Sequence, residues 1–104
     1  MKANDILRTA AELIEQRSAQ RDLAQERSMA RTVAVFNALM GRTERMTEQE
    51  GWLFMICLKL VRATAGKPML DDWMDAAAYC ALGGESVHGQ LQEAPAMSEQ
   101  HANL

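Results

Sequence analysis

Four charged side chains lie beside the most apolar part of the chain, and their spacing suits specific chemistry. Lys59 and Arg62 are three residues apart, as are Asp72 and Asp75, and a turn signal, "AGKP", separates the two pairs. Residues three apart share one face of a helix. With a turn at about residue 67, two antiparallel helices would bring Lys59 level with Asp75, and Arg62 level with Asp72. The sequence therefore predicts two facing cation–carboxylate pairs.

These pairs have a structural and a functional interpretation. As ion pairs, they would fix the register of a helical hairpin, although desolvation offsets most of the Coulomb attraction of a buried pair. As a polar pocket, Lys59 and Arg62 would hold an anionic group such as phosphate, while Asp72 and Asp75 would hold a divalent metal or the edge of a base. The sequence leaves both interpretations open.

A polar segment and two aromatic residues give secondary candidates. "RDLAQER" places Asp22, Glu26 and Arg27 at a break between helices. They form either a solvated connector or a second side of the pocket, where Arg27 would add to the anion site. Trp73 is a candidate subunit contact. Tyr79 shares a helix face with the aspartates, and we expect it mainly to pack in the core.

The composition favours helices as the elements that carry these residues. The chain is rich in alanine, leucine, methionine, glutamate, glutamine and arginine, and only 5% of its residues are aromatic. Apolar periodicity predicts a first helix with Asn4 as its N-cap, a break near residues 20–25, and a second helix over about 29–40. Gly41 is a suitable residue to end that second helix.

The hairpin that carries the four charges has the clearest boundaries. Thr47 and Glu50 have the spacing of a capping box, and Gly66 can adopt the left-handed conformation that ends a helix. We expect its helices over about 47–64 and 70–83, the second stopping at a pair of glycines. The fold prediction is an all-α, compact bundle of about four helices with this antiparallel hairpin at its centre.

Apolar runs identify the expected core. Every residue from Trp52 to Leu58 is apolar, so we expect this helix to be buried nearly all round. Trp52 and Phe54 are expected in the core or an interface, and Asn37 as a core polar group with its hydrogen bonds satisfied. Cys57 and Cys80 are expected as small core hydrophobes in a reducing compartment.

The length of 104 residues suits one domain. We expect residues 1–85 to form a single helical domain and residues 86–104 to form a mobile C-terminal tail, because this segment is polar and contains Pro95. A small monomer with short helices and a methionine-rich core favours a homo-oligomer, a dimer or higher.

The charge distribution excludes some classes of function. The net charge is −3, with eight basic and six acidic residues in 1–46, and three basic and eight acidic residues in 47–104. This balance argues against nucleic-acid binding. No signal peptide or membrane-spanning run is visible, so we expect a cytoplasmic protein without membrane contact.

The segments "ERSMARTVAVFNALMG", "TEQEGWLFMICLKLVRA" and "DDWMDAAAYCALGGE" together resemble a domain of unknown function of small tailed-phage and prophage proteins. The resemblance covers about residues 5–85. It implies an all-helical fold and a phage or prophage origin, and therefore a place in the cytoplasm of a bacterial host.

The chain also has a distant likeness to the all-α nucleoside triphosphate pyrophosphohydrolases. That likeness implies Mg²⁺ bound by acidic pairs on two neighbouring helices, next to a nucleotide's phosphates. Asp72 and Asp75 resemble one such pair, but Lys59 and Arg62 stand where the second pair is expected. Two carboxylates alone would hold Mg²⁺ weakly unless substrate phosphates completed its coordination.

Three hypotheses about function follow. The first is a phage-encoded helical binding protein that needs no catalysis and binds a nucleotide-like anion or a host protein. The second is a Mg²⁺-dependent pyrophosphohydrolase that uses Asp72 and Asp75. The third is a homo-oligomer that acts only through its surface, and it requires the charged pairs to be dry and fully matched.

Overall fold

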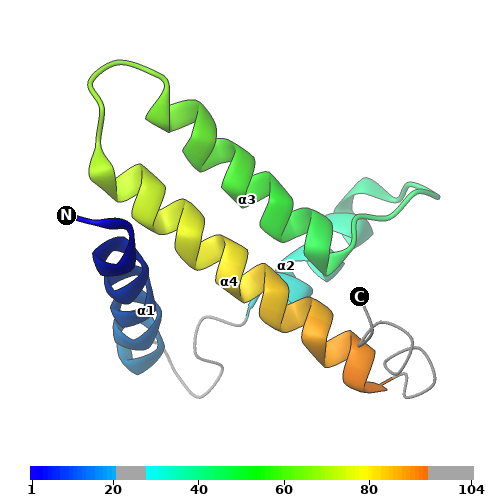
Figure 1. Ribbon diagram of the computed structural model, residues 1–104. Coiled ribbons are helices and arrows are strands. Elements are labelled where there is room, and N and C mark those ends of the chain that lie inside the picture. The colour runs from blue at the N-terminus through cyan, green and yellow to red at the C-terminus, as the bar shows by residue number, and fades with distance from the viewer. Residues whose placement is uncertain (21–27, 94–104) are drawn as a thin grey trace.

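The computed structural model describes residues 1–20 and 28–93, and this part of the chain contains helices and no strands. The four helices are α1 (Ala3–Gln20), α2 (Met29–Met40), α3 (Glu48–Ala63) and α4 (Leu70–Glu93) (Figure 1). The predicted all-α fold with four helices is therefore confirmed.

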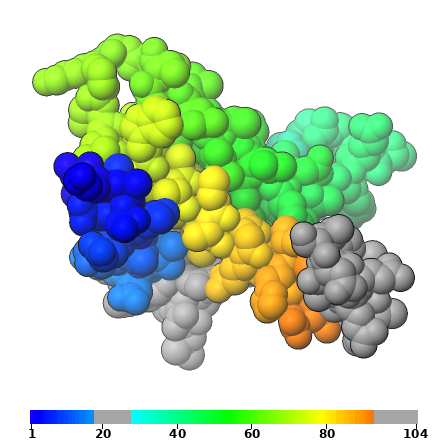
Figure 2. All heavy atoms as spheres, in the orientation of Figure 1, coloured from blue at the N-terminus to red at the C-terminus, as the bar shows by residue number. Residues whose placement is uncertain are grey.

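The helices pack in the order α1–α4–α3–α2. The antiparallel pair of α3 and α4 is central, α1 packs on α4, and α2 packs on α3 (Figure 1). In the space-filling view, α1 and the segment that follows α2 lie at opposite sides of this pair (Figure 2). Since α1 and α2 each contact one member of the hairpin, much of each outer helix surface faces solvent.

Local sequence signals explain three of the helix ends. At the start of α3, the Glu50 backbone N–H donates to the Thr47 hydroxyl, and the Thr47 backbone N–H donates to the Glu50 carboxylate. This is the predicted capping box. Gly41 follows α2 with φ of 60°, and Gly66 lies in the α3–α4 loop with φ of 65°, both in the left-handed region that glycine tolerates.

The predicted start of α1 is wrong by two residues. The helix begins at Ala3, and the backbone N–H of Lys2 donates to the Asp5 carboxylate at 3.0 Å. Asp5 therefore satisfies the exposed backbone donor, and Asn4 lies inside the first turn rather than capping it.

The predicted end of α4 at the two glycines is also wrong. The helix continues through Gly83 and Gly84 to Glu93, so residues 86–93, expected in the tail, are helical. A Cβ atom on Gly83 would lie 3.3 Å from the Trp52 Cβ, and Gln49 donates to the Ser86 hydroxyl at 3.2 Å. Gly83 allows close packing rather than ending the helix. Residues 94–104 lie outside the described residues.

The core is small and lies mainly along α4. Trp52 is its largest member, and its ring centroid lies 6.0 Å from that of the half-buried Tyr79. The predicted core packing of these two residues is confirmed. Within the described part of the chain, the buried apolar residues are Ala10, Val33, Trp52, Met74, Ala76, Ala78 and Leu82.

The prediction that α3 is buried nearly all round is wrong. Its large side chains Leu53 and Phe54 are 57% and 64% exposed, and both Cys57 and Cys80 are exposed free thiols. The reason is the packing order, because α1 lies on α4 and α2 covers only one flank of α3. An apolar run gives no direction, so it could not show that one side of α3 lacks a neighbour.

Two helical glycines make a matched test of the α2–α3 packing. A Cβ atom on Gly51 would lie 2.5 Å from Met29 Sδ and 3.0 Å from Val33 Cγ2, whereas one on Gly84 meets nothing within 4 Å. We expect Gly84→Ala to stabilise the fold by about 0.5–1 kcal/mol through helix propensity. Gly51→Ala gains the same propensity but overpacks, with a cost of about 1–3 kcal/mol.

Chemical denaturation of both variants measures this difference directly. Gly51→Ala should unfold at lower urea concentration than Gly84→Ala. Equal stabilisation by the two substitutions would contradict the close approach of α2 to α3.

Candidate functional site

A charged junction at Asp75 joins three of the four helices. Lys59 Nζ of α3 lies 3.0 Å from Asp75 Oδ2, and Arg17 Nη2 of α1 lies 3.2 Å from Asp75 Oδ1. The side chains of Lys59 and Asp75 are only 13% and 14% exposed, and that of Arg17 is 35% exposed. The predicted Lys59–Asp75 pair is therefore confirmed, and each oxygen of this carboxylate faces a cation.

The second predicted pair does not form. Within the described residues Arg62 and Asp72 make no ion pair, and Arg62 is exposed. Three residues along a helix turn the side chain by 300°, which is 60° short of a full turn. With Lys59 pointing at α4, Arg62 is therefore rotated toward solvent. The second cation that contacts a carboxylate of α4 is instead Arg17, and it contacts Asp75 rather than Asp72.

Arg17 was missed by the sequence analysis, although a signal for it exists. It continues the apolar stripe of α1, since it follows Ala10 by seven residues and Leu13 by four. A basic residue in such a stripe indicates a carboxylate on the helix it packs against. Nothing in a single sequence shows which of the aspartates that is.

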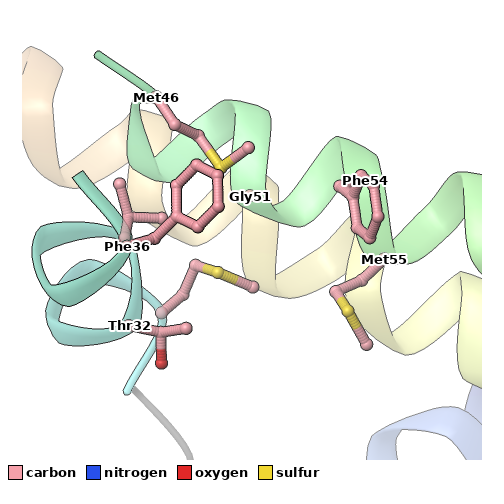
Figure 3. Close-up of a pocket in the computed structure, with 8 residues that line it drawn as sticks. Thr32, Phe36, Met46, Gly51, Phe54 and Met55 are labelled. Atoms are coloured by element: carbon pink, nitrogen blue, oxygen red, sulfur yellow. The ribbon is translucent and has the colours of Figure 1, made fainter. Parts of the chain in front are cut away.

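An apolar groove lies between α2 and α3, and no sequence pattern predicted it. It encloses about 300 Å³. Phe36 and Thr32 belong to α2, Met46 to the following loop, and Phe54 and Met55 to α3 (Figure 3). Its full lining is Met29, Thr32, Val33, Phe36, Met46, Gly51, Phe54 and Met55.

Asn37 holds one wall of this groove in place. Its side-chain amide donates to the Met46 carbonyl at 2.8 Å, and its side-chain oxygen accepts from the Met46 backbone N–H at 2.9 Å. The loop after α2 is thereby fixed with the Met46 side chain against the groove. The expectation that Asn37 is a satisfied polar group is confirmed.

Three arginines belong to the segment that forms the α2 side of the groove, and we call this segment its basic rim. The Arg42 guanidinium lies 5.6 Å from the centre of the Phe36 ring, a cation–π contact. Arg45 directly precedes Met46, and Arg31 directly precedes Thr32. Residues 28–46 contain these three arginines and one acidic residue, Glu44, so this segment carries a net positive charge.

The remaining described candidates are Trp73 and Tyr79, and neither lines the groove. Asp22, Glu26 and Arg27 lie outside the described residues. Trp73 is 54% exposed on α4, in agreement with its expected place at the surface. Tyr79 packs against Trp52.

The described acidic side chains do not form a site that fits Mg²⁺. In residues 1–20 and 28–93, no group of three or more His, Cys, Asp or Glu side chains is placed to hold a metal ion. Both oxygens of Asp75 already face cations, so a metal ion there would have to displace Lys59 and Arg17. The donor set is that of an ion-pair junction.

A family model described as "Domain of unknown function (DUF6378)" matches residues 5–87. No curated protein and no solved structure matches the chain. In the described residues, no helix is long and apolar enough to cross a membrane. The matched range ends within α4 and includes both the Asp75 junction and the groove.

The two aspartates that the sequence grouped together should differ sharply on substitution. Asp75→Asn leaves Lys59 nearly buried without a carboxylate, and we expect it to lower the free energy of unfolding by about 2–3 kcal/mol, below the range for fully buried pairs because both side chains keep some water contact. Asp72→Asn, which breaks no ion pair, should cost less than about 1 kcal/mol. Urea unfolding of both variants provides the measurement, and a loss at Asp72 equal to that at Asp75 would contradict the geometry.

Proposed function

We propose that this chain, which belongs to the DUF6378 family, acts by binding another protein without catalysing a reaction. The site for that partner is the apolar groove between α2 and α3. The observation that carries the proposal is the groove itself, a recess of about 300 Å³ with a methionine-rich lining and a basic rim.

The state of the charged residues supports binding over catalysis. The Lys59 ammonium group is paired with the Asp75 carboxylate. Of the two cations predicted to bind phosphate, only Arg62 would therefore be available. A nearly buried carboxylate that already accepts from two cations is poorly placed to act as a base or to hold a metal ion. The junction has the features of a structural clamp.

The lining of the groove indicates the chemistry of the partner. Three methionines, two phenylalanines and Val33 present flexible and apolar surface to the recess. Methionine adapts its shape to different apolar side chains, and such grooves commonly receive the apolar face of an amphipathic helix. The arginines of the rim favour acidic residues at the edges of that helix.

The resemblance to small phage and prophage proteins supports a partner that belongs to the bacterial host. A host protein in the cytoplasm, bound through one amphipathic helix, would require neither a cofactor nor a reaction from a chain of this size. We place the protein in that compartment as part of the proposal.

Designed peptides test the groove and its rim. One helical peptide carries leucines at i, i+3, i+4 and i+7 with glutamates at both ends, and its control carries lysines in place of the glutamates. We expect the acidic peptide to bind at least about tenfold more tightly, a difference of ~1.4 kcal/mol, measured by fluorescence anisotropy. Equal binding of the two peptides, or none, would contradict the proposed partner.

Matched variants locate the binding. Thr32→Glu puts a negative charge at the groove, whereas Gln16→Glu puts the same charge on the exposed surface of α1. The acidic peptide should lose about tenfold in affinity with Thr32→Glu and nothing with Gln16→Glu.

Nucleotides, with or without Mg²⁺, should leave the melting temperature of the protein unchanged. A magnesium-dependent rise lost in Asp72→Asn would favour the enzyme instead.

A further inference from the structure

One side of α3 carries an apolar stripe that no described helix covers. Leu53, Phe54, Cys57, Leu60 and Val61 are spaced i, i+1, i+4, i+7 and i+8, so they share one face. All five are exposed, Leu60 by 44% and Val61 by 64%. This stripe runs along residues 53–61 of α3.

Apart from Phe54, which also lines the groove, the stripe lies away from the residues with which α3 packs on α2 and α4. Trp52 and Lys59 point toward α4, and Gly51 points toward α2. At 100° per residue, Cys57 lies about 140° from Trp52 around the helix axis. A helix that is apolar on two sides is normally buried on both. In the described part of the chain, α2 and α4 cover the other side of α3, and no helix covers the side that carries the stripe.

We propose that the stripe is the contact surface of a homodimer, in which α3 packs antiparallel against the α3 helix of a second copy. The stripe is symmetric about Cys57, with two large residues three and four positions before it and two large residues three and four positions after it. A two-fold axis at Cys57 places Leu53 against the partner's Val61 and Phe54 against the partner's Leu60. Such self-matching is what a two-fold interface requires.

The charges on α3 favour the antiparallel direction. Glu50 lies in its first turn, on the same face as Cys57, and Lys67 lies in the loop beyond its last turn. An antiparallel pair brings the acidic end of each helix to the basic end of the other, and it also opposes the helix dipoles. Residues 51–58, between these ends, include no charged side chain.

The dimer is independent of the partner proposed for the groove. Phe54 belongs to both features, since it lines the groove and forms part of the stripe. The other seven residues that line the groove lie outside the stripe, so Phe54 is the one residue that the two surfaces share. Peptide binding can therefore fail while the dimer persists, and the reverse outcome is equally distinguishable.

Two valine variants test the surface. Val61 and Val35 are 64% and 60% exposed, but only Val61 lies in the stripe, while Val35 lies on α2. By sedimentation equilibrium, we expect the unmodified protein and Val35→Glu to be dimers and Val61→Glu to be a monomer or to dissociate at least tenfold more readily. A monomeric unmodified protein, or a Val61→Glu dimer of full affinity, would overturn the proposal.

Cysteine cross-linking tests the axis even if Val61→Glu fails to fold. Both thiols are exposed and free. A short bismaleimide should join two copies of Cys80→Ser, which keeps Cys57, and should not join two copies of Cys57→Ser, which keeps Cys80. The opposite pattern would overturn a contact centred on Cys57.

The direction of packing has its own readout. In a background with both native cysteines replaced by serine, Leu53→Cys should cross-link with Val61→Cys when the two proteins are mixed, and neither should cross-link efficiently with itself. Efficient self-linking of Leu53→Cys would show a parallel pair and overturn the antiparallel arrangement.

Discussion

The junction at Asp75 is the interaction on which the arrangement of three helices depends. One carboxylate on α4 receives Lys59 from α3 at 3.0 Å and Arg17 from α1 at 3.2 Å. The apolar core alone gives little orientation, because three of its seven buried members among the described residues are alanines. A nearly buried carboxylate without its cations is costly, so any shift of α1 or α3 that separates these charges is penalised. The junction therefore sets the positions of α1 and α3 on either side of α4. The position of α3 in turn determines which of its side chains remain on the surface.

Because Lys59, Arg17 and Asp75 pair with one another inside the fold, the candidate binding surfaces are apolar. These surfaces lie on α2 and α3. Packing in a row leaves α3 with a groove on the side of α2 and an uncovered stripe on its outer side. Contiguous exposed apolar surface is typical of interaction sites in soluble proteins. The groove has a basic rim and suits a different protein, whereas the stripe is symmetric about Cys57 and suits a second copy. Both surfaces support the proposal that this small protein acts by association.

The sequence predicted local structure and register better than it predicted neighbours. The Thr47–Glu50 capping box, the left-handed Gly41 and the level placement of Lys59 and Asp75 all depend on residues close in sequence or across one short turn. The contact of Arg17 with Asp75 spans 58 positions, and no local pattern encodes it. Gly83 shows that a tertiary contact can also make a local prediction wrong. Its propensity favours a helix end, but its close approach to Trp52 overrides that propensity, and α4 continues. The groove likewise depends on which helix lies beside α3, information that an apolar run does not contain.

Replacement of the whole charged junction by apolar residues tests the central claim that it is structural. In the variant Arg17→Leu/Lys59→Met/Asp75→Leu, all three charges are removed together, so none is left buried without a partner. Such replacements are often neutral or stabilising. Because leucine and methionine fill the same contact between α1, α3 and α4, these helices keep their positions. We therefore predict that the free energy of unfolding in urea stays within about 1 kcal/mol of the unmodified value or rises, and that the same folded variant binds the acidic peptide with unchanged affinity. A variant that folds with this stability but no longer binds would contradict the account, because the charges would then belong to the functional site.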